Sequence, residues 1–487
     1  YFISNDLNLS NIDLFHEGQA LSGALNFKLN NKLWSGSFIT TSIFVDVLSA
    51  NASWNLFGIQ TISSYRYFVE TLNLITTLFI IIFIFKLINE LYLSKTLRTF
   101  IFIIFGFFIL SLVNNNAFGY RELPLFIFLI TVFDTIKKGK INIFNLFIFG
   151  LLPIIGLLWS LDRGVFIIAG YIPFIFILAL NNKIKDIFII FFLILFSILI
   201  FYLMIGKSEF FIFLGNSFDI LRTADLHNGI IHPSPFSGED GSARATKNLL
   251  FIIITGIILI NYVFIKNKNL NKNFIVFLIF FYFVSLVFYK IGVTRSDGGH
   301  LKQGISLCLI LLIYFTIYNL IFVFIKKGFF SFKTNNFLKY INFIIFISLF
   351  IYNLNDNYFA NIKNYKKNIT EYITLEDHSF LSKNEKYLIN ELYEIVREES
   401  CFQVFSYETA LTYYLNKPSC TKFHHIFNMG PKQNQLLFIE QLKKTNNKFI
   451  IVGGNYEGIG NLKGNNEIKL SAKIKFPYIH EFIMNNY

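Results

Sequence analysis

The residues best suited to chemistry lie in polar segments between long apolar stretches, and the first such segment is acidic. Asp13 and Glu17 are four residues apart, with His16 between them. On a helix, side chains four apart share a face, so the two carboxylates could bind a divalent metal such as Mg²⁺ or Mn²⁺. A capping or solvated role accounts for His16 and Glu17 at least as well. We therefore expect a functional role mainly for Asp13.

A second polar segment, residues 291–303, contains the run Arg295-Ser-Asp297-Gly-Gly-His300. Adjacent glycines let backbone amides approach a ligand closely, and here an arginine and a histidine flank them. We interpret this segment as part of a binding site, with a plain turn between two helices as the alternative.

Further charged residues lie in other short segments beside apolar stretches: Arg121, Glu122, Asp162, Arg163, Arg244 and Lys247. Charged side chains are costly near a lipid bilayer, so their accumulation there needs a reason. If the segments converge, they form an electrostatic site for an anionic, phosphorylated substrate carried on a lipid. The adjacent pairs Arg121–Glu122 and Asp162–Arg163 could equally be interfacial ion pairs.

The elements that position these residues are membrane helices. Hydrophobic residues make up 54% of the 487 residues and charged residues 15%, against about 45–50% apolar and about 25% charged in soluble domains. A soluble protein of this composition could not cover its own surface. A membrane helix needs roughly 20 apolar residues. Spans are predicted at 71–92, 98–113, 123–136, 142–159, 164–181, 187–205, 249–265, 273–290, 304–325 and 338–353.

The fold class that follows is mainly α, a polytopic membrane helix bundle over residues 70–353. The span at 123–136 is short enough to be half-inserted. Lys and Arg concentrate in the short segments between alternate spans, which marks the cytoplasmic side of a membrane protein. The net charge of +13 therefore comes mostly from basic residues that set the orientation of the helices in the membrane. A nucleic-acid partner is excluded. The outward segments are 1–69, 114–122, 160–163, 206–248, 291–303 and 354–487.

The two ends of the chain carry further expectations. Because residues 1–69 face outward and then enter the membrane, we expect one more span before Tyr1. Residues 354–487 are polar enough to form a small outward-facing soluble α/β domain. Apolar residues at helical or strand-like spacing predict its elements. Helices are predicted over 383–398, 408–415 and 431–444, and strands over 401–406 and 449–452.

Two pairs of residues in this tail carry expectations of their own. Cys401 and Cys420 lie in an outward domain, where a disulfide is permitted; two buried thiols are the alternative. His424 and His425 have no partner at metal-ligand spacing, which indicates a surface loop.

This layout resembles the GT-C superfamily of polytopic membrane glycosyltransferases, which includes the protein O-mannosyltransferases and the bacterial lipid A aminoarabinose transferases. The shared features are an acidic first outward segment, many spans, a long outward segment and a soluble C-terminal domain. Many members have adjacent acids in the first segment, whereas here Leu14, Phe15 and His16 separate Asp13 from Glu17. The resemblance implies a multi-pass protein of the bacterial inner membrane, with its active site and C-terminal domain periplasmic.

The resemblance also implies a reaction. A polyprenyl-phosphate sugar would be the donor, and a hydroxyl of an envelope glycan, lipid or protein would be the acceptor. Asp13 would be the catalytic base, with inversion at the anomeric carbon. Arg295 would hold the departing lipid phosphate, with Arg244, Lys247 and His300 as weaker candidates.

Two alternatives belong to other classes. An envelope polysaccharide polymerase or ligase also has Arg and His in large outward segments, but such proteins usually lack a soluble α/β domain after the last span. A lipid or sugar flippase would not be an enzyme, and it predicts charged or broken helices at mid-membrane.

Overall fold

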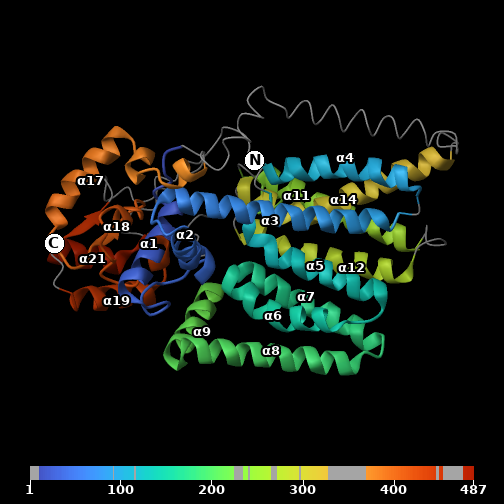
Figure 1. Cartoon of the computed structure of the whole chain (residues 1–487), viewed down its shortest axis with the longest axis horizontal. Coiled ribbons are helices and arrows are strands. Elements are labelled where there is room, and N and C mark those ends of the chain that lie inside the picture. The colour runs from blue at the N-terminus through green and yellow to red at the C-terminus, as the bar shows by residue number, and fades with distance from the viewer. Residues whose placement is uncertain are drawn as a thin grey trace.

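The protein consists of a helical bundle with a smaller folded unit at one end (Figure 1). This computed structural model describes residues 10–91, 93–114, 117–223, 234–239, 242–264, 271–294, 298–326, 369–445, 449–452 and 475–487. Within these ranges, six helices are long and apolar enough to cross a membrane. They start at Ile62, Leu161, Ile184, Ser242, Lys272 and Gly299.

The first nine predicted spans all fall on helices of the bundle. The tenth, 338–353, lies outside the described residues. The helices are α3 (Ile62–Asn89), α4 (Lys95–Asn114), α5 (Leu123–Lys138), α6 (Ile143–Trp159), α7 (Leu161–Leu180), α8 (Ile184–Ile205), α11 (Ser242–Phe264), α12 (Lys272–Phe288) and α14 (Gly298–Lys326). Two shorter helices, α9 (Lys207–Arg222) and α13 (Lys290–Thr294), follow α8 and α12.

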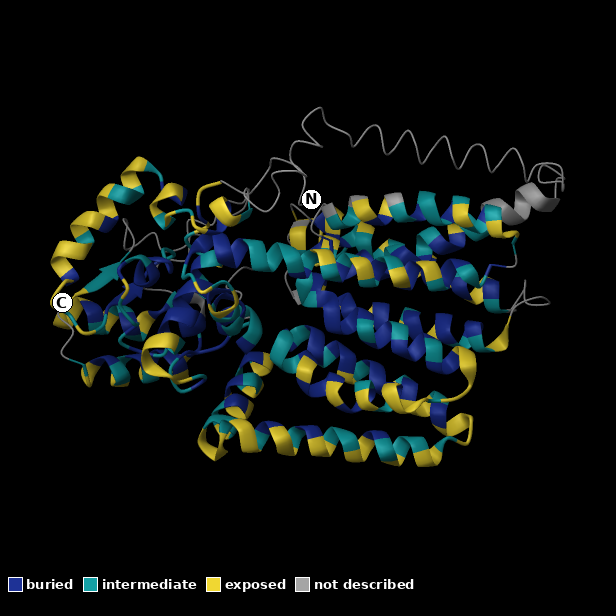
Figure 2. Ribbon diagram, in the orientation of Figure 1, coloured by how far each residue is buried: buried dark blue, intermediate teal, exposed yellow. Residues whose placement is uncertain are grey.

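Aromatic side chains fill the centre of the bundle. Phe128 of α5 stacks on Tyr171 of α7 with ring centroids 5.0 Å apart. Gly170 permits this contact, because a Cβ atom there would lie 2.7 Å from the Phe128 ring. The outer helix faces are apolar but exposed (Figure 2). A helix that is apolar on its exposed face needs lipid as its solvent, which agrees with the composition.

The second unit combines the start and the end of the chain, and we call it the head. From the start come α1 (His16–Asn30), the π-helix η1 (Phe44–Leu48) and α2 (Ser49–Phe57). The tail adds η4 (Asp377–Phe380), α17 (Lys383–Val396), β1 (Gln403–Phe405), α18 (Leu411–Tyr414), η5 (Ile426–Met429), α19 (Lys432–Lys443), β2 (Ile450–Val452) and α21 (Pro477–Asn486). Strands β1 and β2 pair in parallel. The helices and strands predicted for the tail are confirmed to within a few residues.

The two ends of the chain share one hydrophobic core rather than forming separate units. Leu21 of α1 and Trp54 of α2 are buried together with Phe402 and Leu411 of the tail. The Ala410 amide donates to the Leu14 carbonyl at 2.9 Å. Residues 10–60 are therefore a built-in part of the head and not a free segment leading to the bundle.

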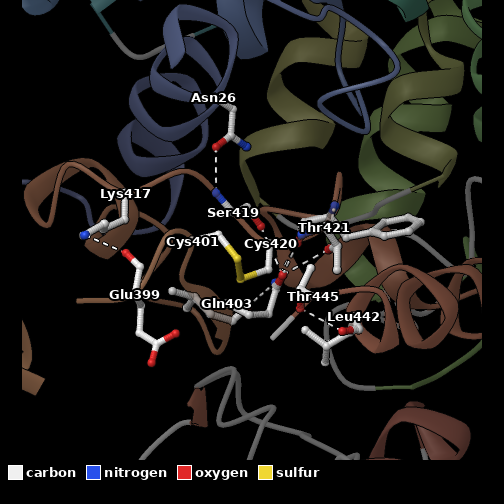
Figure 3. Close-up of a disulfide and its surroundings, with 12 residues drawn as sticks. Asn26, Glu399, Cys401, Gln403, Lys417, Ser419, Cys420, Thr421, Leu442 and Thr445 are labelled. Atoms are coloured by element: carbon white, nitrogen blue, oxygen red, sulfur yellow. Dashed lines mark hydrogen bonds between the residues drawn. A yellow bond between two sulfur atoms is a disulfide. The ribbon is translucent and has the colours of Figure 1, made fainter. Parts of the chain in front are cut away.

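A disulfide closes the middle of the head (Figure 3). Cys401 and Cys420, which the sequence analysis paired, are bonded, with Cα atoms 4.9 Å apart. Next to the bridge, the Ser419 amide donates to Oδ1 of Asn26 in α1 at 2.8 Å. The side-chain oxygen of Gln403 accepts from the Thr421 amide at 3.2 Å. These bonds connect the bridge to both strand β1 and the first segment of the chain.

The head and the basic loops lie at opposite ends of the bundle (Figure 1). At the far end, Lys137 forms an ion pair with Glu90, and Lys86 pairs with Asp134 at 2.6 Å. The first segment and the tail therefore lie on the same side of the bundle, as their predicted common sidedness requires. Which side faces outward stays a prediction.

Candidate functional site

Asp13 forms a close pair with His16 at the start of α1. One carboxylate oxygen of Asp13, Oδ2, lies 2.7 Å from Nδ1 of His16. The other, Oδ1, accepts from the amides of Phe15 and His16 at 3.0 and 2.9 Å. The hydrogen bond from His16 lowers the pKa of Asp13 to about 2. Asp13 is therefore ionised at neutral pH, and it is a weak base.

His16 is the exposed member of this pair. Its side chain is 70% exposed, whereas that of Asp13 is 49% exposed. When Nδ1–H donates to a carboxylate, the neutral imidazole has its lone pair on Nε2. A carboxylate that fixes the tautomer in this way also stabilises the imidazolium formed when Nε2 accepts a proton. The pair can therefore act as a surface-exposed general base.

Glu17 has a structural role. Its two carboxylate oxygens accept from Nε and Nη2 of Arg66, at 2.6 and 2.7 Å. Arg66 itself is buried and also donates to the carbonyl of Ser10 at 2.9 Å. Asp13 and Glu17 were predicted as candidate metal ligands, but both carboxylate oxygens of Glu17 are already bound by Arg66. In the described part of the chain, no three His, Cys, Asp or Glu side chains gather closely enough to hold a metal ion.

Aromatic residues of the tail surround the Asp13–His16 pair. The ring of Phe15 packs against His425 at 4.6 Å and against Tyr407 at 5.3 Å between centroids. The prediction of a surface loop at His424 and His425 is wrong, because both residues are buried. Burial lowers the pKa of His424 to about 4, so this ring is neutral. The sequence could not show that α1, almost four hundred residues upstream, covers this loop.

A second charged region lies where the head meets the bundle, and we call it the junction. Here the predicted residues Arg121, Glu122, Asp162 and Arg163 do converge. Nε and Nη2 of Arg163 donate to Oε1 of Glu122 at 2.8 and 2.6 Å. Nη2 of Arg121 donates to both oxygens of Asp162, at 2.9 and 3.0 Å. Arg163 also pairs with Asp162.

The charges of the junction cancel. Two arginines face two carboxylates, and the side chains of Arg163 and Glu122 are only 1% and 3% exposed. The interpretation of these residues as interfacial ion pairs therefore fits their geometry. Gln303 near the start of α14 lies 3.5 Å from Nη2 of Arg163, which brings the start of α14 to the same place. The junction has no net charge of its own with which to bind a phosphate.

The junction also anchors the head to the bundle. The Leu161 amide at the start of α7 donates to the carbonyl of Thr41 at 2.8 Å. Phe44 of η1 stacks on Trp159 of α6, with ring centroids 3.8 Å apart. These contacts fix the position of η1 relative to α6 and α7.

Asp46 in η1 is an acid that the sequence analysis did not select. Its Oδ2 accepts from the amides of Thr40 and Thr41 at 2.7 and 2.8 Å. Its Oδ1 is buried and has no hydrogen-bond partner among the described residues. Burial raises the pKa of Asp46 to about 6. The signal was present, because Asp46 is a single acid inside the apolar run Ile43–Leu48 of an outward segment.

Helix α3 sets the spacing between the two charged regions. Arg66 on α3 binds Glu17 beside the Asp13–His16 pair. Asn73 on the same helix accepts from the Tyr120 amide, next to the junction, at 2.8 Å. Seven residues of helix span about 10 Å. Helix α3 therefore links the Asp13–His16 pair to the junction through two contacts about 10 Å apart along its axis.

The candidate phosphate-binding residues lie at the starts of α11 and α14. Arg244 and Lys247 are exposed, and neither has an acidic partner among the described residues. The two helix starts are adjacent, because Tyr289 packs with Ile252 of α11 and Ile305 of α14. The predicted His300, with Lys302, is thus on the helix start adjacent to the one that carries Arg244 and Lys247. Arg295 and Asp297 lie outside the described residues.

Comparison of the chain with protein-family models, with curated proteins and with solved structures found no match. The resemblance to GT-C enzymes therefore rests on the layout of the sequence, and the chemistry rests on the geometry of the two charged regions and the two helix starts.

Proposed function

We propose that this helical membrane protein is a glycosyltransferase that moves a sugar from a polyprenyl-phosphate donor to an acceptor hydroxyl. The observation that carries the proposal is the exposed Asp13–His16 pair, on a head fixed to the bundle end where Arg244 and Lys247 are exposed. A base and an unneutralised cationic surface are the two groups that such a transfer needs. The head would face the periplasm of a bacterial cell envelope.

The proton passes to His16 in this proposal. Nε2 of His16 takes the proton of the acceptor hydroxyl as that oxygen attacks the anomeric carbon. The bond from this carbon to the phosphate oxygen breaks, and its electron pair leaves with the lipid phosphate. Asp13 stays ionised and holds the imidazolium through Nδ1. The resemblance to GT-C enzymes implies that Asp13 itself takes the proton, but its pKa of about 2 suits a positioning carboxylate better.

The leaving group needs charge neutralisation rather than a proton, because a phosphate diester oxygen leaves as an anion. Arg244 and Lys247 supply that charge, with His300 and Lys302 on the adjacent helix start and Arg295 as the residue implied by the resemblance to GT-C enzymes. One displacement at the anomeric carbon inverts its configuration, since the carboxylate beside Asp13, that of Glu17, is bound by Arg66 and is not free to act as a nucleophile.

The distribution of charge in the helices argues against a flippase. In the described bundle helices, no Asp, Glu, Lys or Arg lies in the middle third of a helix. A transporter that moves a charged headgroup across the bilayer generally places polar groups or broken helices at mid-membrane. The described charges instead lie at the helix ends.

The decisive experiment measures sugar transfer by the purified full chain in lipid nanodiscs. A panel of short polyprenyl-phosphate sugars serves as donors, and donor binding is measured separately. We expect His16→Gln to lower turnover by about 10²–10⁴-fold with donor affinity unchanged. His378→Gln changes an exposed histidine elsewhere on the head and is the matched control. Wild-type turnover in His16→Gln would exclude the proposed base.

The phosphate contacts need their own variants. Arg244→Ala and Lys247→Ala should each weaken donor binding by about tenfold or more, because each removes a charge-assisted hydrogen bond. Unchanged donor affinity in both would contradict the phosphate assignment. If His16→Gln and Asp13→Asn keep full activity while Arg244→Ala is inactive, the polysaccharide polymerase or ligase becomes the better interpretation.

A further inference from the structure

Helix α9 has an apolar face that no described part of the protein covers. It begins two residues after α8 ends, across Gly206, whose φ of 81° allows the sharp turn between the two helices. Phe211, Leu214, Phe218 and Leu221 are all exposed, Phe218 at 65%. Their spacing of three, four and three residues places them on one side of the helix.

The opposite face of α9 is fixed to the head. Phe213 and Ile220 are buried. The side chain of Asn216 accepts from the Ile39 amide at 3.3 Å and donates to the Ile39 carbonyl at 2.6 Å. Glu209 accepts from the Trp34 amide at 2.8 Å. Helix α9 is therefore a rigid part of the structure, and its exposed face has a defined direction.

The surface that leads into α9 is apolar and exposed, as the surface of a lipid-facing helix is. Helix α8 has a mean hydropathy of 3.1, and only 11% of its most apolar stretch is buried in protein. Its last turns expose Leu203 and Met204. Exposed residues follow the length of α8 and recur on α9 after the turn (Figure 2), and those at its last turn and on α9 are apolar.

We propose that α9 lies in the lipid–water interface, with its exposed apolar face in the bilayer boundary, and that it fixes the height of the head above the membrane. Interfacial helices bury one apolar face about 5–10 Å into this boundary. Because the other face holds Trp34 and Ile39, bilayer contact is transmitted to the segment that leads to Asp46. The inference does not depend on the proposed reaction.

The charges of α9 indicate whether apolar burial or attraction to anionic lipids would hold it at the membrane. Lys207 and Arg222 are balanced by Glu209 and Asp219, so the helix has no net charge. Electrostatic attraction to anionic lipids needs clustered basic residues. Association of α9 should therefore depend on apolar burial, and it should not respond to the fraction of anionic lipid or to salt.

Spin labels can measure the position of α9 directly. The full chain with Cys308→Ala is labelled at Phe211→Cys or Phe218→Cys and reconstituted in phosphatidylcholine nanodiscs. Collisions with oxygen, which partitions into lipid, are compared with collisions with a water-soluble nickel chelate. Leu203→Cys on α8 is the lipid reference. Tyr387→Cys, an exposed aromatic residue on α17 of the head, is the matched water control.

We expect both α9 labels to favour oxygen over nickel, with a depth between those of the two references and no change when anionic lipid is added. Collision ratios equal to those of Tyr387→Cys would show a water-exposed helix and overturn the proposal. Low access to both reagents, or dipolar broadening between labels on two molecules, would show a protein partner and overturn it as well. A loss of transferase activity plays no part in this test.

Discussion

The Asp13–His16 pair and the junction are both built from charged side chains, but their environments are opposite. In the first, a half-exposed carboxylate holds a histidine that faces solvent. In the second, Arg163 and Glu122 are withdrawn from water and satisfy each other. The exposed pair can exchange a proton with a substrate, whereas the buried pairs can only fix the structure around them.

The difference shows how the two regions would divide the task in the proposed transferase. Buried ion pairs contribute little net stability but are costly to break, so the junction holds the head in one orientation on the bundle. Reactive groups need access to substrate, so they lie on the head surface. Asp46 lies between these cases, because it is buried like the junction but has an oxygen without a described partner.

The largest effect should come from breaking the junction. Arg163→Ala leaves Glu122 buried without its partner, which typically costs about 3–5 kcal/mol. We expect a loss of this size in the free energy of unfolding, measured by denaturing-detergent titration of the full chain in a mild detergent. Replacing both residues by leucine should recover most of the loss. Arg397→Ala, at an exposed arginine of the head, should change stability by no more than about 0.5 kcal/mol.

Asp46 should make stability depend on pH. Its pKa of about 6 in the folded state exceeds the ordinary value of 3.8, so between these values the folded protein binds more protons than the unfolded chain. Its contribution is therefore fully present below about pH 4 and is lost as pH rises through 6. Asp46→Asn should remove this loss, which is on the order of 3 kcal/mol for a shift of this size. Identical pH profiles of the wild type and the variant would contradict the raised pKa.

A substitution at Asp13 separates its catalytic from its structural role. Asparagine can cap the turn before α1 as aspartate does, but it cannot stabilise an imidazolium ion. We expect Asp13→Asn to lower sugar-transfer turnover by about 10²-fold, with unchanged donor affinity and, because the pair with His16 is half-exposed, a loss of stability of no more than about 1 kcal/mol. A variant with full turnover would show that His16 does not need its carboxylate partner.

The smallest effect should be the loss of the cap alone. Asp13→Ala removes both hydrogen bonds to the amides of Phe15 and His16, and such a loss typically costs about 1 kcal/mol. We expect this decrease in the free energy of unfolding relative to Asp13→Asn, in the same titration. A decrease as large as that of Arg163→Ala would contradict the proposed difference between the exposed Asp13–His16 pair and the buried junction.

The fold was predictable where a local pattern decides it. Runs such as Ile184–Ile205 are apolar over a whole span, and the tail elements follow from short-range spacing. The site was predictable only in part. The sequence indicated Asp13 and the junction residues, since charges beside apolar stretches stand out.

What the sequence could not show depends on contacts between distant segments. His424 is buried because α1 packs against its loop. Glu17 is bound by Arg66, which lies on α3. The pKa of Asp46 is raised because this residue is buried between the head and the bundle. In each case the residue type is visible in the sequence, but its partner lies in another element. The chemistry of a carboxylate depends on that partner and on burial.

The shared core of the head also sets an order of events during synthesis. Thr412 Oγ1 donates to Ser22 Oγ, across 390 residues of sequence. Residues 10–60 emerge from the ribosome long before the tail, and they cannot bury Leu21 or Trp54 until the tail arrives. The bundle must therefore insert while this part of the head is still incomplete. The disulfide between Cys401 and Cys420 closes a loop within the tail itself, so the bridge can form before the tail packs against residues 10–60.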